Sequence, residues 1–88
     1  MLTIIRSSKF KKEFQLMLKR GNNVSLFEEV INLLVGQQPL PAKYRNHPLK
    51  GKYKGYMDLH ISPDWILIYK IQDDTLLLDR TGTHSDLF

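Results

Sequence analysis

The sequence has no cysteine, so it can form neither a disulfide bond nor a thiolate metal site. It also lacks any apolar run near the ~20 residues that a transmembrane helix needs, and we expect no membrane partner. Its first residues, Met1–Arg6, lack the basic start, long apolar stretch and cleavage site of a signal peptide. These absences are compatible with a reducing compartment, and we predict a cytoplasmic protein.

Acidic residues are nearly missing from two parts of the chain. Residues 1–20 hold six Lys or Arg and one acid, and residues 43–54 hold five basic residues and no acid. The part from residue 55 onward reverses this balance, with six Asp against two basic residues. The net charge of +4 is therefore uneven. Such a distribution favours a polyanionic partner about as strongly as it favours a merely soluble surface.

At 88 residues, with 42% hydrophobic and 25% charged residues, the chain has the size and composition of one globular domain, residues 1–88. A first strand is predicted over residues 2–6. A helix is expected from about Lys9, capped by Ser7 or Ser8 and ended by Gly21. A second helix follows, with a capping box of Ser25 and Glu28, and stops at Gly36.

Residues 37–52 contain three prolines and are predicted to be irregular. The rest of the chain then shows strand patterns over residues 56–61, 65–71 and 75–81, joined by short turns, which predict a three-stranded antiparallel meander. The element order is β-α-α-β-β-β. We expect an α+β fold in which two antiparallel helices pack on one face of a mostly antiparallel sheet.

The alternation at residues 56–61 assigns side chains to two faces. Three of them would face the core: Met57, Leu59 and Ile61. Three would lie on an open sheet surface: Tyr56, Asp58 and His60. A carboxylate and an imidazole would thus be neighbours on a rigid strand, with Asp64 at the adjoining turn.

The meander can also bring later groups toward this surface. The full candidate set is His47, Asp58, His60, Asp64, Arg80, His84 and Phe88. Cleavage of RNA without a metal needs a base, an acid and positive charge on the transition state, which histidine, aspartate and arginine supply. Taken singly, each residue also fits a structural role: a surface histidine, an aspartate in a tight turn, or an arginine paired with an Asp.

Two alternatives follow from the same residues. The basic loop, with Lys50, Lys52 and Lys54, could serve a non-catalytic RNA-binding or ribosome-binding module. A metal-dependent hydrolase would use Asp58, His60, Asp64 and His84 as ligands, although no dense ligand spacing occurs.

Five segments resemble the YafQ branch of the RelE-like bacterial toxins: His47–Gly51, Lys54–Tyr56, Asp58–Ile61, Pro63–Tyr69 and Arg80–Phe88. Their spacing matches from about Pro39 to the end, and the β-α-α part agrees more loosely. The resemblance implies a RelE-like fold and the toxin of a type II toxin–antitoxin pair. Such a toxin cuts mRNA in the ribosomal A site, leaves a 2′,3′-cyclic phosphate and a 5′-hydroxyl, and is blocked by a cognate antitoxin.

The resemblance also implies roles for individual residues, and neither a cofactor nor a metal. His47, His60, Asp64 and His84 match the family's catalytic positions, and Asp58 matches an active-site carboxylate. Arg80 matches a residue suited to the scissile phosphate, and Phe88 an aromatic that holds the substrate. We expect His84 or Asp64 as the base, His60 as the acid, and His47 with Arg80 on the phosphate. Lys50, Lys52 and Lys54 are expected to bind substrate.

Overall fold

The sheet has five strands in the order β1-β5-β4-β3-β2, and the computed structural model describes all residues 1–88. The predicted antiparallel meander is present as β3 (Met57–Ser62), β4 (Trp65–Gln72) and β5 (Thr75–Gly82). At one edge β1 (Thr3–Arg6) pairs with β5 in parallel, and at the other β2 (His47–Pro48) pairs with β3 antiparallel. The expected α+β class, with a mostly antiparallel sheet, is confirmed.

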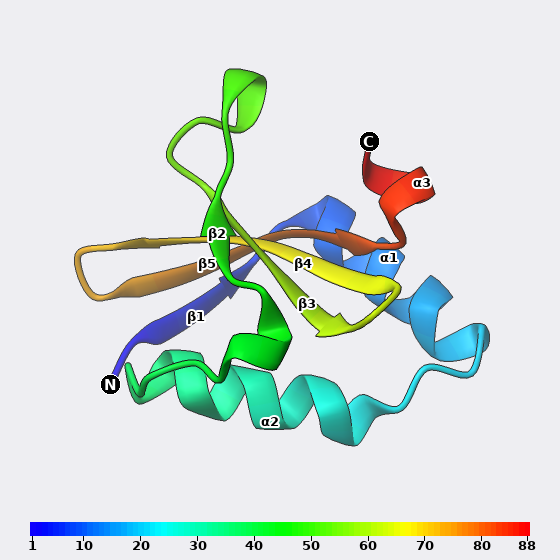
Figure 1. Cartoon of the computed structure of the whole chain (residues 1–88), viewed down its shortest axis with the longest axis horizontal. Helices are drawn as coiled ribbons and strands as arrows, with labels where there is room; N and C mark the ends of the chain where they lie inside the picture. The colour runs from blue at the N-terminus through cyan, green and yellow to red at the C-terminus, as the bar shows by residue number, and fades with distance from the viewer.

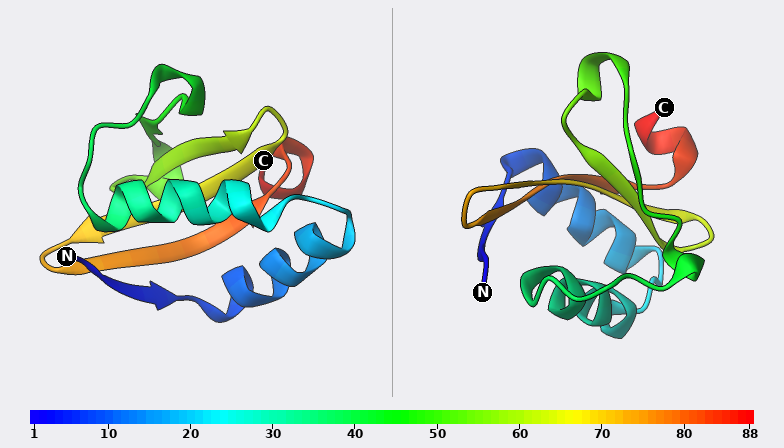
Figure 2. Two further views of the ribbon diagram at one scale, coloured as in Figure 1. Left: turned by 90° about the horizontal axis from the view of Figure 1, so that it is seen from below. Right: turned by 60° about the vertical axis from the view of Figure 1, so that its left-hand side comes forward.

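Both long helices, α1 (Ser8–Lys19) and α2 (Val24–Val35), lie on one side of the sheet and run in roughly opposite directions (Figures 1 and 2). The start of α1 is defined by Ser7, whose hydroxyl accepts the Phe10 backbone N–H at 2.9 Å. Its end comes just before Gly21, whose φ of +91° suits the left-handed turn that follows a helix. No helix combines the length and apolar character that crossing a bilayer requires.

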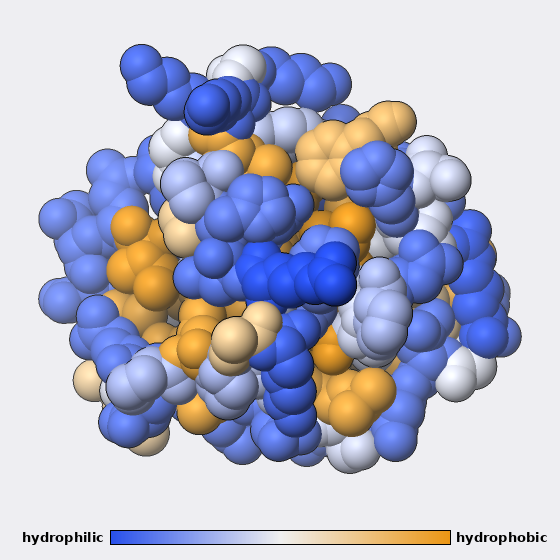
Figure 3. Space-filling model, viewed as in Figure 1, coloured by the Kyte–Doolittle hydropathy of each residue, from blue (hydrophilic) through white to orange (hydrophobic).

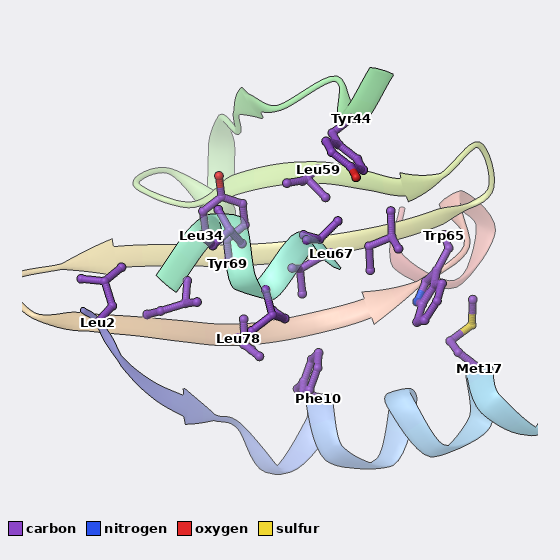
Figure 4. Close-up of a cluster of buried hydrophobic side chains, with 14 residues drawn as sticks. Leu2, Phe10, Met17, Leu34, Tyr44, Leu59, Trp65, Leu67, Tyr69 and Leu78 are labelled. Carbon is purple, nitrogen blue, oxygen red and sulfur yellow. The ribbon is translucent and has the colours of Figure 1, made fainter. Parts of the chain in front are cut away.

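The main core lies between these helices and the sheet (Figure 4). Phe10 and Met17 of α1 and Leu34 of α2 meet apolar side chains of the meander, including Leu67 and Trp65. Trp65 is 0% exposed, so its role is structural, as expected. The predicted alternation is also confirmed, because Leu59 and Ile61 belong to this core and Met57 packs against it.

The predicted capping box of the second helix is wrong. Helix α2 begins at Val24, and Asn23 is its N-cap, whose side-chain oxygen accepts the Ser25 backbone N–H at 2.9 Å. The Ser25 hydroxyl donates to the same Asn23 oxygen at 2.7 Å. Asparagine caps helices at least as well as serine, and here it lies where the helix direction begins.

The predicted irregular segment also needs correction. Residues 37–52 include the turn η1 (Ala42–Tyr44), the strand β2 and the start of the turn η2 (Gly51–Tyr53), and the last residues form a short helix, α3 (His84–Leu87). A two-residue strand is too short to show a period, so only its pairing with β3 reveals it. Residues 50–54, which contain η2 and are called the η2 segment below, project together with α3 from the face of the sheet opposite α2 (Figure 1).

A chain of buried hydrogen bonds connects β4 with β5. Nε1 of Trp65 donates to the Thr81 hydroxyl, which donates to the carbonyl oxygen of Ile66, each at 2.8 Å. Thr81 is 1% exposed, so no water can replace the hydroxyl at low cost.

We predict that Thr81→Val destabilises the fold by roughly 1–3 kcal/mol, or about 4–8 °C in Tm for each kcal/mol, because Trp65 keeps a buried, unpaired indole N–H. Thermal unfolding measures this. Thr75→Val, at the start of the same strand, is the matched control and should change Tm little. Equal changes for both variants would contradict the prediction.

Candidate active site

The face of the sheet opposite the helices carries the candidate catalytic residues in two rows across the strands. The register pairs His47 with Asp58, Asp58 with Ile68 and Ile68 with Arg80, so these groups lie in one row from β2 to β5. A second row pairs His60 with Ile66 and Ile66 with Gly82, and α3 begins two residues after Gly82. The buried Ile66 and Ile68 form the apolar floor of this site.

Asp58 is the central acid of the site. The face predicted for it is confirmed, but the surface is not open there, because Asp58 is only 5% exposed. Nδ1 of His47 lies 3.0 Å from Oδ1 of Asp58. It also contacts the carbonyl oxygen of Arg45 at 2.9 Å, and Oδ1 has no hydrogen bond of its own. Nδ1 therefore faces two acceptors, which favours the tautomer with the proton on Nδ1 and leaves Nε2 of His47 for a ligand.

Burial raises the pKa of the Asp58 carboxyl above its ordinary 3.8, because water no longer solvates the charged form. The opposing effects on this pKa come from His47, His60 and His84, in that order. All of the histidines in the chain are thus within electrostatic range of one buried carboxyl group. His47 comes from β2, His60 from β3 and His84 from α3.

His84 is positioned by the folding of the last six residues onto the end of β5. Thr83 and Asp86 form a capping box at the start of α3. Nη1 of Arg20, just after α1, donates to Asp86 at 2.7 Å and lowers the pKa of that carboxyl well below its usual value. At Gly82 a Cβ would lie 2.9 Å from Cβ of Asp86, so only glycine allows this close fold-back.

Arg80 lies on the same face but is already engaged. Its guanidinium forms an ion pair with Glu13 of α1, and Nη1 donates to the Tyr53 hydroxyl at 3.1 Å. The structural partner expected for Arg80 was an Asp, whereas the partner is Glu13.

Asp64 stands somewhat apart from the other candidates. It is an exposed residue of the turn between β3 and β4, and no hydrogen bond or ion pair joins it to a histidine. The pairing of Ile66 with Gly82 nevertheless places this turn beside the start of α3, where His84 lies. Asp64 also contributes to the raised pKa of Arg20, a residue that binds α3.

Aromatic and basic residues border the site. Phe88 is 53% exposed, and its ring centroid lies 5.2 Å from that of His84 and 6.4 Å from that of Tyr53. The predicted substrate-binding lysines, Lys50, Lys52 and Lys54, are exposed on the η2 segment. Figure 3 shows that this projecting segment is covered by hydrophilic side chains.

Two residues of the site were not predicted as such. Tyr53 contacts Arg80 and Phe88, and Glu13 binds Arg80 from the helix layer. The only signal for Tyr53 was its place among basic residues, and the only signal for Glu13 was that it is the single acid of residues 1–20.

A groove of about 390 Å³ adjoins the site along the later residues of β3, which β2 does not pair with. His60 lines it together with Lys43 and Arg45, and Leu26 and Pro63 add apolar surface. None of its lining residues is acidic. The groove therefore places two basic side chains, Lys43 and Arg45, beside His60.

Comparison with known proteins identifies the family. A model described as "Bacterial toxin of type II toxin-antitoxin system, YafQ" matches residues 2–88. The chain belongs to the YafQ family. The mRNA interferase toxin YafQ of Escherichia coli is 46% identical over 83 residues, covering 93% of this chain and 90% of the relative. The motifs of the second half thus indicated the correct family and its enzyme class, endoribonuclease.

Solved structures of similar toxins agree with the fold. The toxin in the E. coli DinJ–YafQ complex is 44% identical, with a TM-score of 0.91 over 100% of this chain and 99% of that one. A copper-bound mutant toxin from Helicobacter pylori is 41% identical, with a TM-score of 0.95 over 100% of both chains.

The geometry of this YafQ-family chain bears on the metal alternative. No three His, Asp or Glu side chains lie close enough together to hold a metal ion. The ligand set considered above, Asp58, His60, Asp64 and His84, is therefore not assembled in this fold.

The raised pKa of Asp58 gives a prediction with a definite sign. Because the folded state holds this proton more tightly than the unfolded state, stability falls as the pH rises from the ordinary carboxyl value of 3.8 through the raised value. Asp58→Asn should therefore raise Tm at neutral pH, and this gain should vanish below pH 3.8.

Thermal unfolding of both proteins across this pH range measures the effect. Asp74→Asn removes the same charge from an exposed turn and should show no such pH dependence. A gain for Asp58→Asn that is the same at all pH values would show that burial of the charge is not its cause.

Proposed function

We propose that this toxin is a ribosome-dependent endonuclease that cuts mRNA in the A site by metal-independent acid–base catalysis. One observation carries the proposal: Nδ1 of His47 lies 3.0 Å from the buried Asp58, and His60 and His84 are within electrostatic range of the same carboxyl group, on the face that also holds Arg80. Histidines titrate near neutral pH, so this face can both accept and donate protons under cellular conditions. The family, and the name of the E. coli relative, mRNA interferase toxin, support an enzyme that acts on mRNA.

The reaction requires a base, an acid and a stabilised phosphorane-like transition state. We assign His84, or Asp64 of the neighbouring turn, to removal of the 2′-hydroxyl proton, and His60 to protonation of the leaving 5′-oxygen. Attack of the 2′-oxygen on phosphorus then breaks the bond to the 5′-oxygen and yields a 2′,3′-cyclic phosphate and a 5′-hydroxyl. Nε2 of His47 and the guanidinium of Arg80 stabilise the charge on the phosphate oxygens.

Substrate contacts follow from the borders of the site. The exposed lysines of the η2 segment neutralise backbone phosphates, and the exposed Phe88 ring offers a surface for an unpaired base. We propose that ribosome and mRNA are the partners of this face.

We also propose a cognate antitoxin as a protein partner, because a YafQ relative forms a complex with DinJ. An antitoxin segment that is acidic would complement the basic residues of the η2 segment and cover the site. Inhibition would then follow from exclusion of mRNA rather than from a change in the fold.

Mapping of mRNA 5′ ends on ribosomes, after induction of the toxin, tests the catalytic assignment. We predict new ends within the A-site codon for the wild type, and a loss of roughly 100-fold or more for His60→Ala or His84→Ala, because each removes a proton-transfer group. Wild-type cleavage on programmed ribosomes should persist when transition-metal ions are chelated and Mg²⁺ is retained for the ribosome, which separates this chemistry from that of a transition-metal-dependent hydrolase. Equal cleavage by wild type and His84→Ala would refute the assignment.

A second prediction separates catalysis from binding by the η2 segment. Neutralising Lys50, Lys52 and Lys54 to Gln should raise the toxin concentration needed for half-maximal cleavage on programmed ribosomes and reduce its salt dependence, because three phosphate contacts are lost. The maximal rate should change little.

The matched control replaces three exposed lysines of α1, Lys9, Lys11 and Lys12, by Gln. If instead the His60 and His84 variants inhibit translation fully and only the η2 variant fails, the protein is a non-catalytic RNA-binding or ribosome-binding module.

A further inference from the structure

The guanidinium of Arg80 is held from two directions by residues that the reaction scheme does not use. Nε donates to the two carboxylate oxygens of Glu13 at 3.2 and 3.1 Å, and Nη2 makes a further, short contact with Oε2. On the other side, Nη1 donates to the Tyr53 hydroxyl at 3.1 Å. The Arg80 and Glu13 side chains are only 18% and 20% exposed, so water screens this ion pair weakly.

These contacts leave part of the guanidinium free. Of its five N–H groups, the contacts use Nε–H and one on each terminal nitrogen. One N–H therefore remains on each of Nη1 and Nη2, and each can donate to an oxygen of a phosphate group. The contacts with Glu13 and Tyr53, called the clamp below, thus fix the Arg80 side chain and still leave it N–H donors that can bind an anion.

Glu13 is also attached to the strand that carries Arg80. Its Oε1 accepts the backbone N–H of Thr81 at 3.3 Å. One carboxylate therefore fixes both the head group of Arg80 and the backbone of the next residue. Glu13 belongs to α1 and contacts Arg80, the last member of the row that runs from His47 through Asp58. It is therefore a neighbour of the site rather than a part of the substrate surface.

We propose that Glu13 is a positioning residue for the endonuclease reaction: it binds Nε and Nη2 of Arg80, so that the two remaining N–H groups are preset for the scissile phosphate. The inference rests on the function proposed above. A free arginine side chain would lose considerable rotamer freedom when it meets the transition state, and this ion pair removes that freedom beforehand. Glu13 itself touches neither substrate nor reacting atoms.

A double-mutant cycle tests the proposal. In the wild-type background, Glu13→Gln should lower the maximal rate of mRNA cleavage on programmed ribosomes roughly 10- to 100-fold, the range for loss of a hydrogen bond to a charged group. The half-saturating toxin concentration should change little. In the Arg80→Ala background, Glu13→Gln should have almost no further effect, because Glu13 acts only through Arg80.

The controls separate positioning from stability. Glu28→Gln makes the same charge change on an exposed glutamate of α2 that has no ion pair, and should leave the rate unchanged. Glu13→Asp keeps the charge and should restore part of the rate lost in Glu13→Gln. Tm is measured for every variant, and each rate is taken below the onset of unfolding.

Two results would overturn the inference: an equal loss in both backgrounds, which indicates a general structural role, or a faster rate in Glu13→Gln, which indicates that Glu13 withholds Arg80 from the phosphate. Hydrogen exchange of the Arg80 Nε–H, followed by NMR, reports the clamp without any cleavage assay. Unchanged exchange in Glu13→Gln would show that no clamp exists in solution. Absence of cleavage by the wild-type protein would instead refute the proposed function.

Discussion

Antiparallel pairing within the meander places Asp58, Ile68 and Arg80 in one row, and the whole site depends on that register. Because side chains alternate between the faces of a sheet, a shift of one residue would send Asp58 and His60 into the helix-covered core. The apolar floor of Ile66 and Ile68 and the opposite core of Leu67 and Trp65 hold the register from both sides. The packing of β4 on both faces therefore maintains the geometry of the candidate chemistry.

The charges of the site are balanced by the helix layer. Burying the Asp58 carboxylate, with one oxygen lacking a hydrogen bond, is unfavourable for folding, and the nearby histidines offset only part of this cost. Helix α1 supplies Glu13 to Arg80, and just beyond its end Arg20 binds Asp86. The helix thus does more than cover the core, because it secures both the arginine of β5 and the short helix that carries His84.

Much of this architecture could be predicted from local patterns. The period of two over residues 56–61 identified the core face of β3 correctly, and Ser7 and Gly21 marked the ends of α1. The failures have two physical causes: neighbouring residues compete for one helix cap, and some elements are too short to show a pattern. Asn23 and Ser25 compete for one cap, and the two residues of β2 and four of α3 are too few to show a period. The identity of the candidate residues was predictable, because few residue types titrate near neutral pH.

By itself the sequence determined the two long helices and the meander, the face of each β3 side chain, the family and the inventory of histidines and aspartates, since all of these follow from short-range spacing and residue chemistry. Only the tertiary structure decided that Asp58 is buried, that Asp64 stays at an exposed turn, and that Arg80 is held by Glu13, 67 residues away. Burial and long-range ion pairs depend on how the layers pack, and no local period encodes that packing.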